Sequence, residues 1–236
     1  YDNGDGTFTI LMNQEHGNNV GVERAHGVRG AYVSQFVIDK TTFEVVSGRD
    51  LANSFWTWNS DAVALVQIEA PLPGEPDLRV MNRLCSADLA APTAFFNSAT
   101  GLGTSLRIFT NGEESGSEGR AFAWPVSGTD ARKAIHLPHL GRFSWENSLP
   151  APKEQDITIV AGMDDGNNGE VYFYIGQKQG AGSDVQKAGL IGGKLYGLRV
   201  PGKPFEIGPG YTHGRVEHFD LADLGDVSTL TGVQLT

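Results

Sequence analysis

The chain has 236 residues and a mass of 25.3 kDa, which suits one sizeable domain. Its formal charge of −10 argues against nucleic acid or an anionic membrane as the main partner, because both require a basic surface. No apolar run approaches the roughly 20 residues that span a bilayer as a helix, and the single Cys85 excludes an internal disulfide.

Short apolar segments between turn residues predict strands along the whole chain. The first follows the turn Asp2–Gly6, and a four-residue connection, DKTT, predicts a hairpin. Any helix within Cys85–Asn97 is limited to one or two turns by Pro92. In chain order, the predicted strands are Thr7–Asn13, Ala31–Asp39, Phe43–Ser47, Ala62–Ile68, Leu106–Thr110, Arg120–Trp124, the two strands of Ile157–Gly176, Lys194–Val200 and Arg215–Asp220.

Paired short strands with almost no helical periodicity favour an all-β sandwich, barrel or propeller. A glycine or acidic turn followed by an aromatic-rich strand recurs in GTFTILMN, GEVYFYIG and GKLYGLRV. We interpret these as blade strands of a β-propeller, complete or incomplete, built of antiparallel strand pairs with acidic, glycine-rich loops. Their period is irregular, unlike a WD40 repeat. No linker divides the chain, so residues 1–236 are expected to form one propeller-like domain.

Four acidic clusters lie at or near predicted strand ends. Carboxylate and amide oxygens held on tight turns suit Ca²⁺, which takes about six to eight oxygen ligands. Strand ends on one face of a propeller converge on its centre, and several carboxylates cannot all ionise there without a cation. The pattern therefore leaves two alternatives, a shared metal centre or solvated turn residues. The clusters contain Glu15, then Glu113 and Glu114 with Glu118, then Glu146, and finally Asp164 and Asp165.

Other motif-like residues are interpreted as structural. The segment that begins at Asp2 starts like an EF-hand loop, but its twelfth position is Asn13 and no flanking helix is expected. Trp56 and Trp58 alternate on a strand-like segment, which predicts packing in the core or at its rim. No nucleophile elbow, Walker loop or Rossmann fingerprint is present. The histidines that lack the spacing of zinc sites are His16, His26, His136 and His139.

Several segments resemble the PhoX-type alkaline phosphatases. NQEHG and the following GVERAHGVRGAYVSQFVIDKTTFEVV look like the opening region of that family. NGEESGSEGR is similar to its Glu-Glu loop, and GRFSWENS to its Gly-Arg-Phe-x-His-Glu segment. ITIVAGMDDGNNGEVYFYIG resembles its Gly-Asp-Asp strand pair. The four motifs occur in the family's order and cover most of the chain.

This resemblance implies a β-propeller phosphomonoesterase of the bacterial periplasm or exterior, with Ca²⁺ and iron at a carboxylate-rich centre. Phosphate esters and divalent cations are the implied partners. Arg142 or Arg120 would complete a phosphate clamp, or would serve as a structural ion-pair partner. Glu146 and Arg142 would have catalytic roles. The implied metal ligands are Glu15, Glu113 or Glu114, Glu146, and Asp164 or Asp165.

The sequence also departs from the family. Trp145 stands where the family has histidine, and Cys85 lacks the context of the cysteine at the family's iron centre. The chain is shorter than family members and begins at Tyr1, so we expect a processed product or part of a longer polypeptide, associated with the rest of the propeller or with other copies. An alternative function is a non-catalytic, calcium-stabilised propeller that acts as an extracellular binding or structural protein. A third is carbohydrate binding by tryptophans and acidic loops.

Overall fold

The computed structural model describes residues 1–167, 169–201 and 219–235, and most of its regular structure is β-strand. No helix in these residues is long and apolar enough to cross a membrane. The helical elements are α1 (Asp184–Lys187) and the 3₁₀ helices η1 (Pro92–Ala94), η2 (Pro138–Leu140) and η3 (Gly232–Gln234). The strands are β1 (Thr7–Gln14), β2 (Tyr32–Asp39), β3 (Val45–Asp50), β4 (Ser54–Asn59), β5 (Ala64–Gln67), β6 (Leu84–Leu89), β7 (Phe96–Asn97), β8 (Leu102–Gly103), β9 (Ile108–Glu113), β10 (Ala121–Pro125), β11 (Lys133–His136), β12 (Trp145–Pro150), β13 (Ile157–Asp164), β14 (Val171–Gln177), β15 (Lys194–Arg199) and β16 (Asp220–Gly225).

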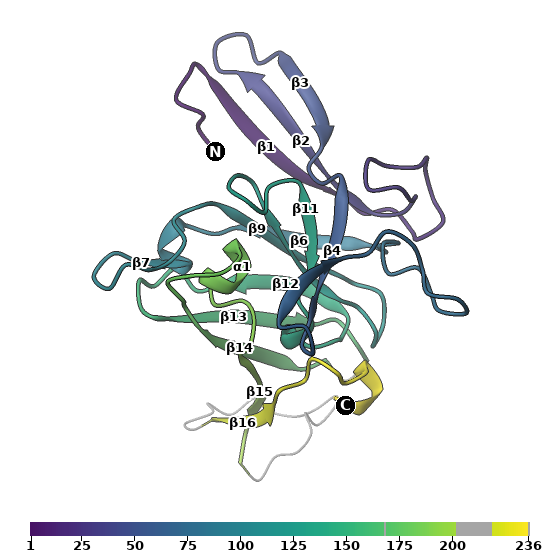
Figure 1. Ribbon diagram of the computed structural model, residues 1–236, viewed down its shortest axis with the longest axis vertical. Helices are drawn as coiled ribbons and strands as arrows, with labels where there is room; N and C mark the ends of the chain where they lie inside the picture. The colour runs from purple at the N-terminus through teal and green to yellow at the C-terminus, as the bar shows by residue number, and fades with distance from the viewer. Residues whose placement is uncertain (168, 202–218, 236) are drawn as a thin grey trace, which may run out of the picture.

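The strands form three larger sheets. Their orders are β1-β2-β3, β5-β4-β11-β10-β9-β6 and β12-β13-β14-β15-β16, and β7 and β8 form a small additional pair. Neighbouring strands in the described residues are antiparallel except β4 and β11, which run parallel. In Figure 1 the three-stranded sheet stands off at the top, while β12 to β16 lie in the middle and lower part of the molecule.

The six-stranded sheet is the middle layer, because both of its faces are buried. β10 is buried along its whole length. Ala121 and Ala123 belong to one core, shared with the five-stranded sheet, whereas Phe122 and Trp124 belong to a second core, shared with Val33 of β2. This alternation follows from the two-residue period of a strand. Packing on both faces holds the middle sheet rigidly, so the ends of its strands are well placed to carry a site.

The predicted all-β class with antiparallel pairs is confirmed. The hairpin in Ile157–Gly176 is β13 and β14, and the pair around NGEESGSEG is β9 and β10. The predicted turn at the start of the chain is also present, since the amide of Gly4 donates to Asp2 Oδ1 at 2.7 Å. The propeller arrangement stays a prediction. The predicted strand Arg215–Asp220 lies largely outside the described residues.

The short helix predicted within Cys85–Asn97 is present, but several strands in the middle of the chain were not predicted. Residues Leu84–Leu89 form β6, an edge strand paired with β9, so Cys85 lies on a strand rather than in a helix. Only the short η1, opened by Pro92, is helical there. Strands β11 and β12 were not predicted at all. Trp56 and Trp58 do pack at the rim of the core, partly buried, as expected.

Candidate metal centre

Five side chains from five different strands converge at one place. Glu15 directly follows β1, Cys85 is the second residue of β6, Glu114 directly follows β9, Glu146 is the second residue of β12, and Asp165 directly follows β13. They form two triplets that share Glu114, and in each triplet three potential ligand atoms lie within 4.8 Å of one another. One triplet is Glu15, Cys85 and Glu114, and the other is Glu114, Glu146 and Asp165.

Close packing of β12 on its neighbours positions Glu146. A β-carbon built on Gly112 of β9 would lie 2.3 Å from Cβ of Trp145, and one built on Gly162 of β13 would lie 2.7 Å from the Trp145 ring. Only glycine at these positions lets the indole approach so closely. Trp145 also stacks on Phe143 with ring centroids 4.0 Å apart. The pairing of β12 with β13 shifts register between Trp145 and Asn147, which gives Glu146 a local bulge.

A chain of side-chain hydrogen bonds connects β1 to the middle sheet. Trp124 Nε1 donates to Asn111 Oδ1 at 2.7 Å, and Asn111 Nδ2 donates to Asn13 Oδ1 at 2.8 Å. Asn13 Nδ2 in turn donates to the carbonyl of Cys85 at 2.7 Å. Because Asn13 lies two residues before Glu15, this chain holds Glu15 beside Cys85.

The centre is rich in negative charge. Its one nearby cation in the described residues is Arg83, whose Nη2 lies 2.9 Å from Glu114 Oε1 and 3.3 Å from Glu15 Oε1. Burial, reinforced by the adjacent carboxylates, raises the pKa of the Cys85 thiol to about 11. The thiol lies 3.7 Å from Glu146 Oε2, to which it donates. Carboxylates and a thiol gathered around so little positive charge form a donor set that a bound cation would complete.

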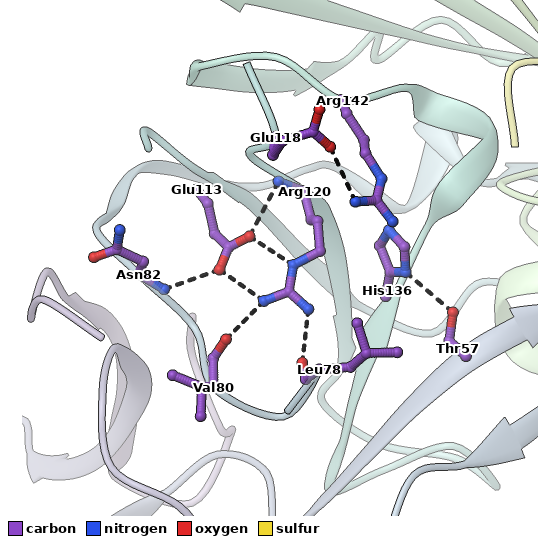
Figure 2. A network of polar contacts seen from close by, with 9 residues as sticks. All are labelled: Thr57, Leu78, Val80, Asn82, Glu113, Glu118, Arg120, His136 and Arg142. Atoms are coloured by element: carbon purple, nitrogen blue, oxygen red, sulfur yellow. Dashed lines mark hydrogen bonds and ion pairs between the residues drawn. The ribbon is translucent and has the colours of Figure 1, made fainter. Parts of the chain in front are cut away.

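Glu113, predicted as an alternative ligand, does not join this group. Its carboxylate accepts from Arg120 Nε at 2.7 Å and Nη2 at 2.8 Å, and from the amide of Asn82 at 2.9 Å, as Figure 2 shows. Arg120 also donates to the carbonyls of Leu78 and Val80. Both charged side chains are buried, so the pair is a structural unit within the fold.

Asp164, the other predicted alternative, acts in the hairpin turn. Its Oδ1 accepts from the amides of Ser144 and Gly166, both at 3.0 Å. Burial raises the pKa of Asp164 above its ordinary value despite these hydrogen bonds. Its neighbour Asp165 is the one that joins the acidic group.

The two arginines predicted for a phosphate clamp lie elsewhere. Arg120 is committed to Glu113. Arg142 Nη1 donates to Glu118 Oε2 at 3.2 Å, and Glu118 is held by the amide of Gly232 at 2.9 Å. Neither arginine contacts the acidic group in the described residues, and both have the ion-pair role that was the alternative for them.

Sequence reasoning missed two members of the centre, Cys85 and Arg83. Cys85 was set aside because the segment around it matched no known context. Its one available signal was Leu84–Leu89 as a strand, which would have placed the thiol at a strand end. Arg83 has a positive φ of 46° directly before β6, and this conformation of a non-glycine residue cannot be predicted from the sequence.

Comparisons with known proteins give one structural similarity. No protein-family model and no curated protein matched the sequence. Among solved structures, the chain is similar to Pseudomonas fluorescens PhoX in complex with vanadate, a transition state analogue, with a TM-score of 0.45 and 12% identity. The match covers 84% of this chain and 44% of that chain, so this chain spans less than half of the PhoX structure.

Proposed function

We propose that this chain carries the metal centre of a phosphomonoester hydrolase. The observation that supports this proposal best is the convergence of Glu15, Cys85, Glu114, Glu146 and Asp165 from five strand ends.

The sharing of Glu114 favours two neighbouring ions. The triplet Glu114, Glu146 and Asp165 offers only oxygen atoms, which suits Ca²⁺. The triplet Glu15, Cys85 and Glu114 includes a thiol, a softer ligand that suits iron or another transition metal. Ions held by these two triplets would supply Lewis-acid chemistry, polarising a phosphoryl oxygen and activating the attacking oxygen.

Arg83 is the residue of this chain that we expect to bind the phosphate group. Its side chain is 49% exposed and stands over Glu15 and Glu114. A guanidinium can hold two phosphate oxygens at once through parallel N–H donors. Arg83 would thereby orient the ester beside the carboxylates and offset charge that develops in the transition state.

Metal analysis and a phosphatase assay on the same protein test the proposal. We expect bound Ca²⁺ and a transition metal by elemental analysis, and hydrolysis of para-nitrophenyl phosphate that a chelator abolishes. Glu146→Gln should abolish hydrolysis with little effect on the melting temperature. Glu44→Gln makes the same chemical change at an exposed site on the β2–β3 connection and should leave hydrolysis unchanged.

A second candidate function is a calcium-stabilised binding or structural protein without catalysis. It is favoured by the engagement of Arg120 and Arg142 in ion pairs rather than at the centre. Ca²⁺ that raises the melting temperature without any turnover would support this function and overturn the hydrolase. Absence of both metal and turnover would overturn the metal centre itself. Action in the periplasm or outside the cell, and association with further propeller strands or other copies, stay predictions.

A further inference from the structure

An open hollow of about 300 Å³ lies beside β4 and β11, at the same end of the six-stranded sheet as Glu113 and Glu114. β4 and β11 run parallel, so both strands leave the sheet at the same end. The turn after β4 and the 3₁₀ helix η2 diverge there, and the segment at Ser228 and Thr229 closes the third side. No member of the acidic group lines this hollow. In the sheet, β10 separates β11, which borders the hollow, from β9, which ends directly before Glu114.

His136 gives the hollow a buried polar atom with nothing to bind. The residue is 4% exposed, and its Nδ1 lies 3.0 Å from Thr57 Oγ1. Its Nε2 has no hydrogen-bond partner among the described residues. A buried nitrogen without a partner is unfavourable, and a ligand group that reaches Nε2 would satisfy it. Burial, together with the charges of Arg120 and Arg142, lowers the pKa of His136 well below its ordinary value, so the ring is neutral at pH 7.

Arg142 gives the hollow a positioned cation. Glu118 holds its Nη1, and Glu118 is itself anchored to the backbone at Gly232, so the guanidinium is oriented in advance. The other two nitrogens have no protein partner in the part of the chain that the structure describes, and about a third of the side chain is exposed. Figure 2 shows Arg142 and His136 on neighbouring segments next to the Glu113–Arg120 pair.

The other lining residues give the hollow apolar surface and hydroxyl groups beside Arg142 and His136. Trp58, Leu78 and Pro138 supply apolar surface, and hydroxyl groups of Ser60, Ser228 and Thr229 surround it. The volume is at the lower end of the range for small-molecule sites. Asp61 is the acidic lining residue, so the ligand cannot be a large polyanion.

We infer that this hollow is a second binding site, separate from the acidic group, for a small molecule carrying one oxyanion group that Arg142 binds beside His136. Nε and Nη2 of Arg142 donate to the anion, and His136 Nε2 donates as well when Thr57 gives its hydroxyl proton to Nδ1. Trp58 and Leu78 contact the remainder of the ligand. The anion is a carboxylate or a phosphate, since both present oxygens to a guanidinium in the same way.

NMR of the histidine side chains tests this site in protein kept metal-free with a chelator. The full chain is titrated with inorganic phosphate, with acetate and with neutral methyl glucoside, while the ¹⁵N signals of the His136 ring are followed. We expect saturable shifts of the His136 Nε2 signal with at least one anion and none with the glucoside. The two anions together distinguish a phosphate site from a carboxylate site.

Two matched variants locate the binding. Arg142→Gln should lower the affinity for the anion at least tenfold. Arg199→Gln makes the same change in net charge at an exposed ion pair and should leave the affinity unchanged. Wild-type His136 signals that move with neither anion would overturn the site, whatever the variants do. Equal affinity in wild type and Arg142→Gln would overturn it too. Because no metal is present, these outcomes are independent of whether the acidic group binds ions.

Discussion

Glu113 and Glu114 are adjacent in sequence but have opposite environments. Neighbouring residues on a strand point to opposite sides, and here one carboxylate meets Arg120 while the other meets the acidic group. The same substitution at the two positions therefore separates folding from metal binding.

We expect Glu114→Gln to lose metal at both triplets with little change in stability, because Glu114 belongs to both and is partly exposed. Glu113→Gln should instead retain the ligands but destabilise the fold by about 3–5 kcal/mol, since it leaves Arg120 buried without its counter-charge. Elemental analysis per chain and urea unfolding measure the two effects. Equal metal loss in both variants would contradict this division.

A second prediction at the residue scale concerns the role of Arg83 in binding phosphate. If the proposed function holds, Arg83→Gln should raise KM for a phosphate ester about tenfold or more while metal content stays at the wild-type level, because Arg83 would bind phosphate without being a metal ligand. Arg83→Lys should recover only part of the affinity, since an ammonium lacks the paired donors. An unchanged KM in both variants, measured by steady-state kinetics, would remove Arg83 from the phosphate site.

At the scale of elements, the position of β12 depends on two glycines beneath Trp145. Without room at Gly112, the indole would have to shift and β12 would move with it. Glu146 is the next residue, so the packing of a core tryptophan and the geometry of the acidic group are coupled. Trp145 is buried and stacked on Phe143, which makes it a packing residue in this chain rather than a ligand.

We expect Gly112→Ala to destabilise the protein by about 1–3 kcal/mol through overpacking and to weaken metal binding as well. Near-ultraviolet circular dichroism should report the movement of Trp145, and calorimetric titration the loss of affinity. Gly116→Ala is the control, because a β-carbon there has no atom within 4 Å, although its φ of 73° adds local strain. Full metal affinity in Gly112→Ala would show that the position of β12 does not determine the geometry of the metal ligands.

At this scale, sequence patterns predicted some of the strands and missed others. Alternation and turn residues were sufficient for β1, β9, β10, β13 and β14, because these pair with neighbours along the chain. β11 has only four residues, too few to show a clear alternation, and its parallel pairing with β4 joins segments far apart in sequence. The choice between Glu113 and Glu114 depended on which face of β9 meets Arg120, and that requires the assembled sheet.

At the scale of the whole molecule, stability depends on pH through three histidines that are buried in the described part of the chain. Burial lowers the pKa of His26, His136 and His139 below the ordinary value of 6.5. The unfolded chain therefore binds protons near pH 6.5 that the native protein does not bind. Their contribution is complete above that pH and declines as the pH falls below it.

The melting temperature should accordingly decrease as the pH is lowered from 7.5 to 5.5. The free energy of unfolding should fall by up to about 1.4 kcal/mol per pH unit for each histidine. Most carboxyl groups titrate below this range, so the histidines dominate it. His136→Gln should reduce the slope, as measured by circular dichroism melts in matched buffers. A melting temperature that stays constant between these pH values would contradict the prediction.

The chain of side-chain hydrogen bonds from Trp124 through Asn111 and Asn13 to the carbonyl of Cys85 has a consequence for the order of folding. It closes only after β1, from the beginning of the chain, has docked on strands formed much later in the sequence. Such non-local contacts form slowly, because a long loop must close before they contribute. Ion uptake at the triplet that contains Glu15 would therefore follow the docking of β1, and its rate would report that last step.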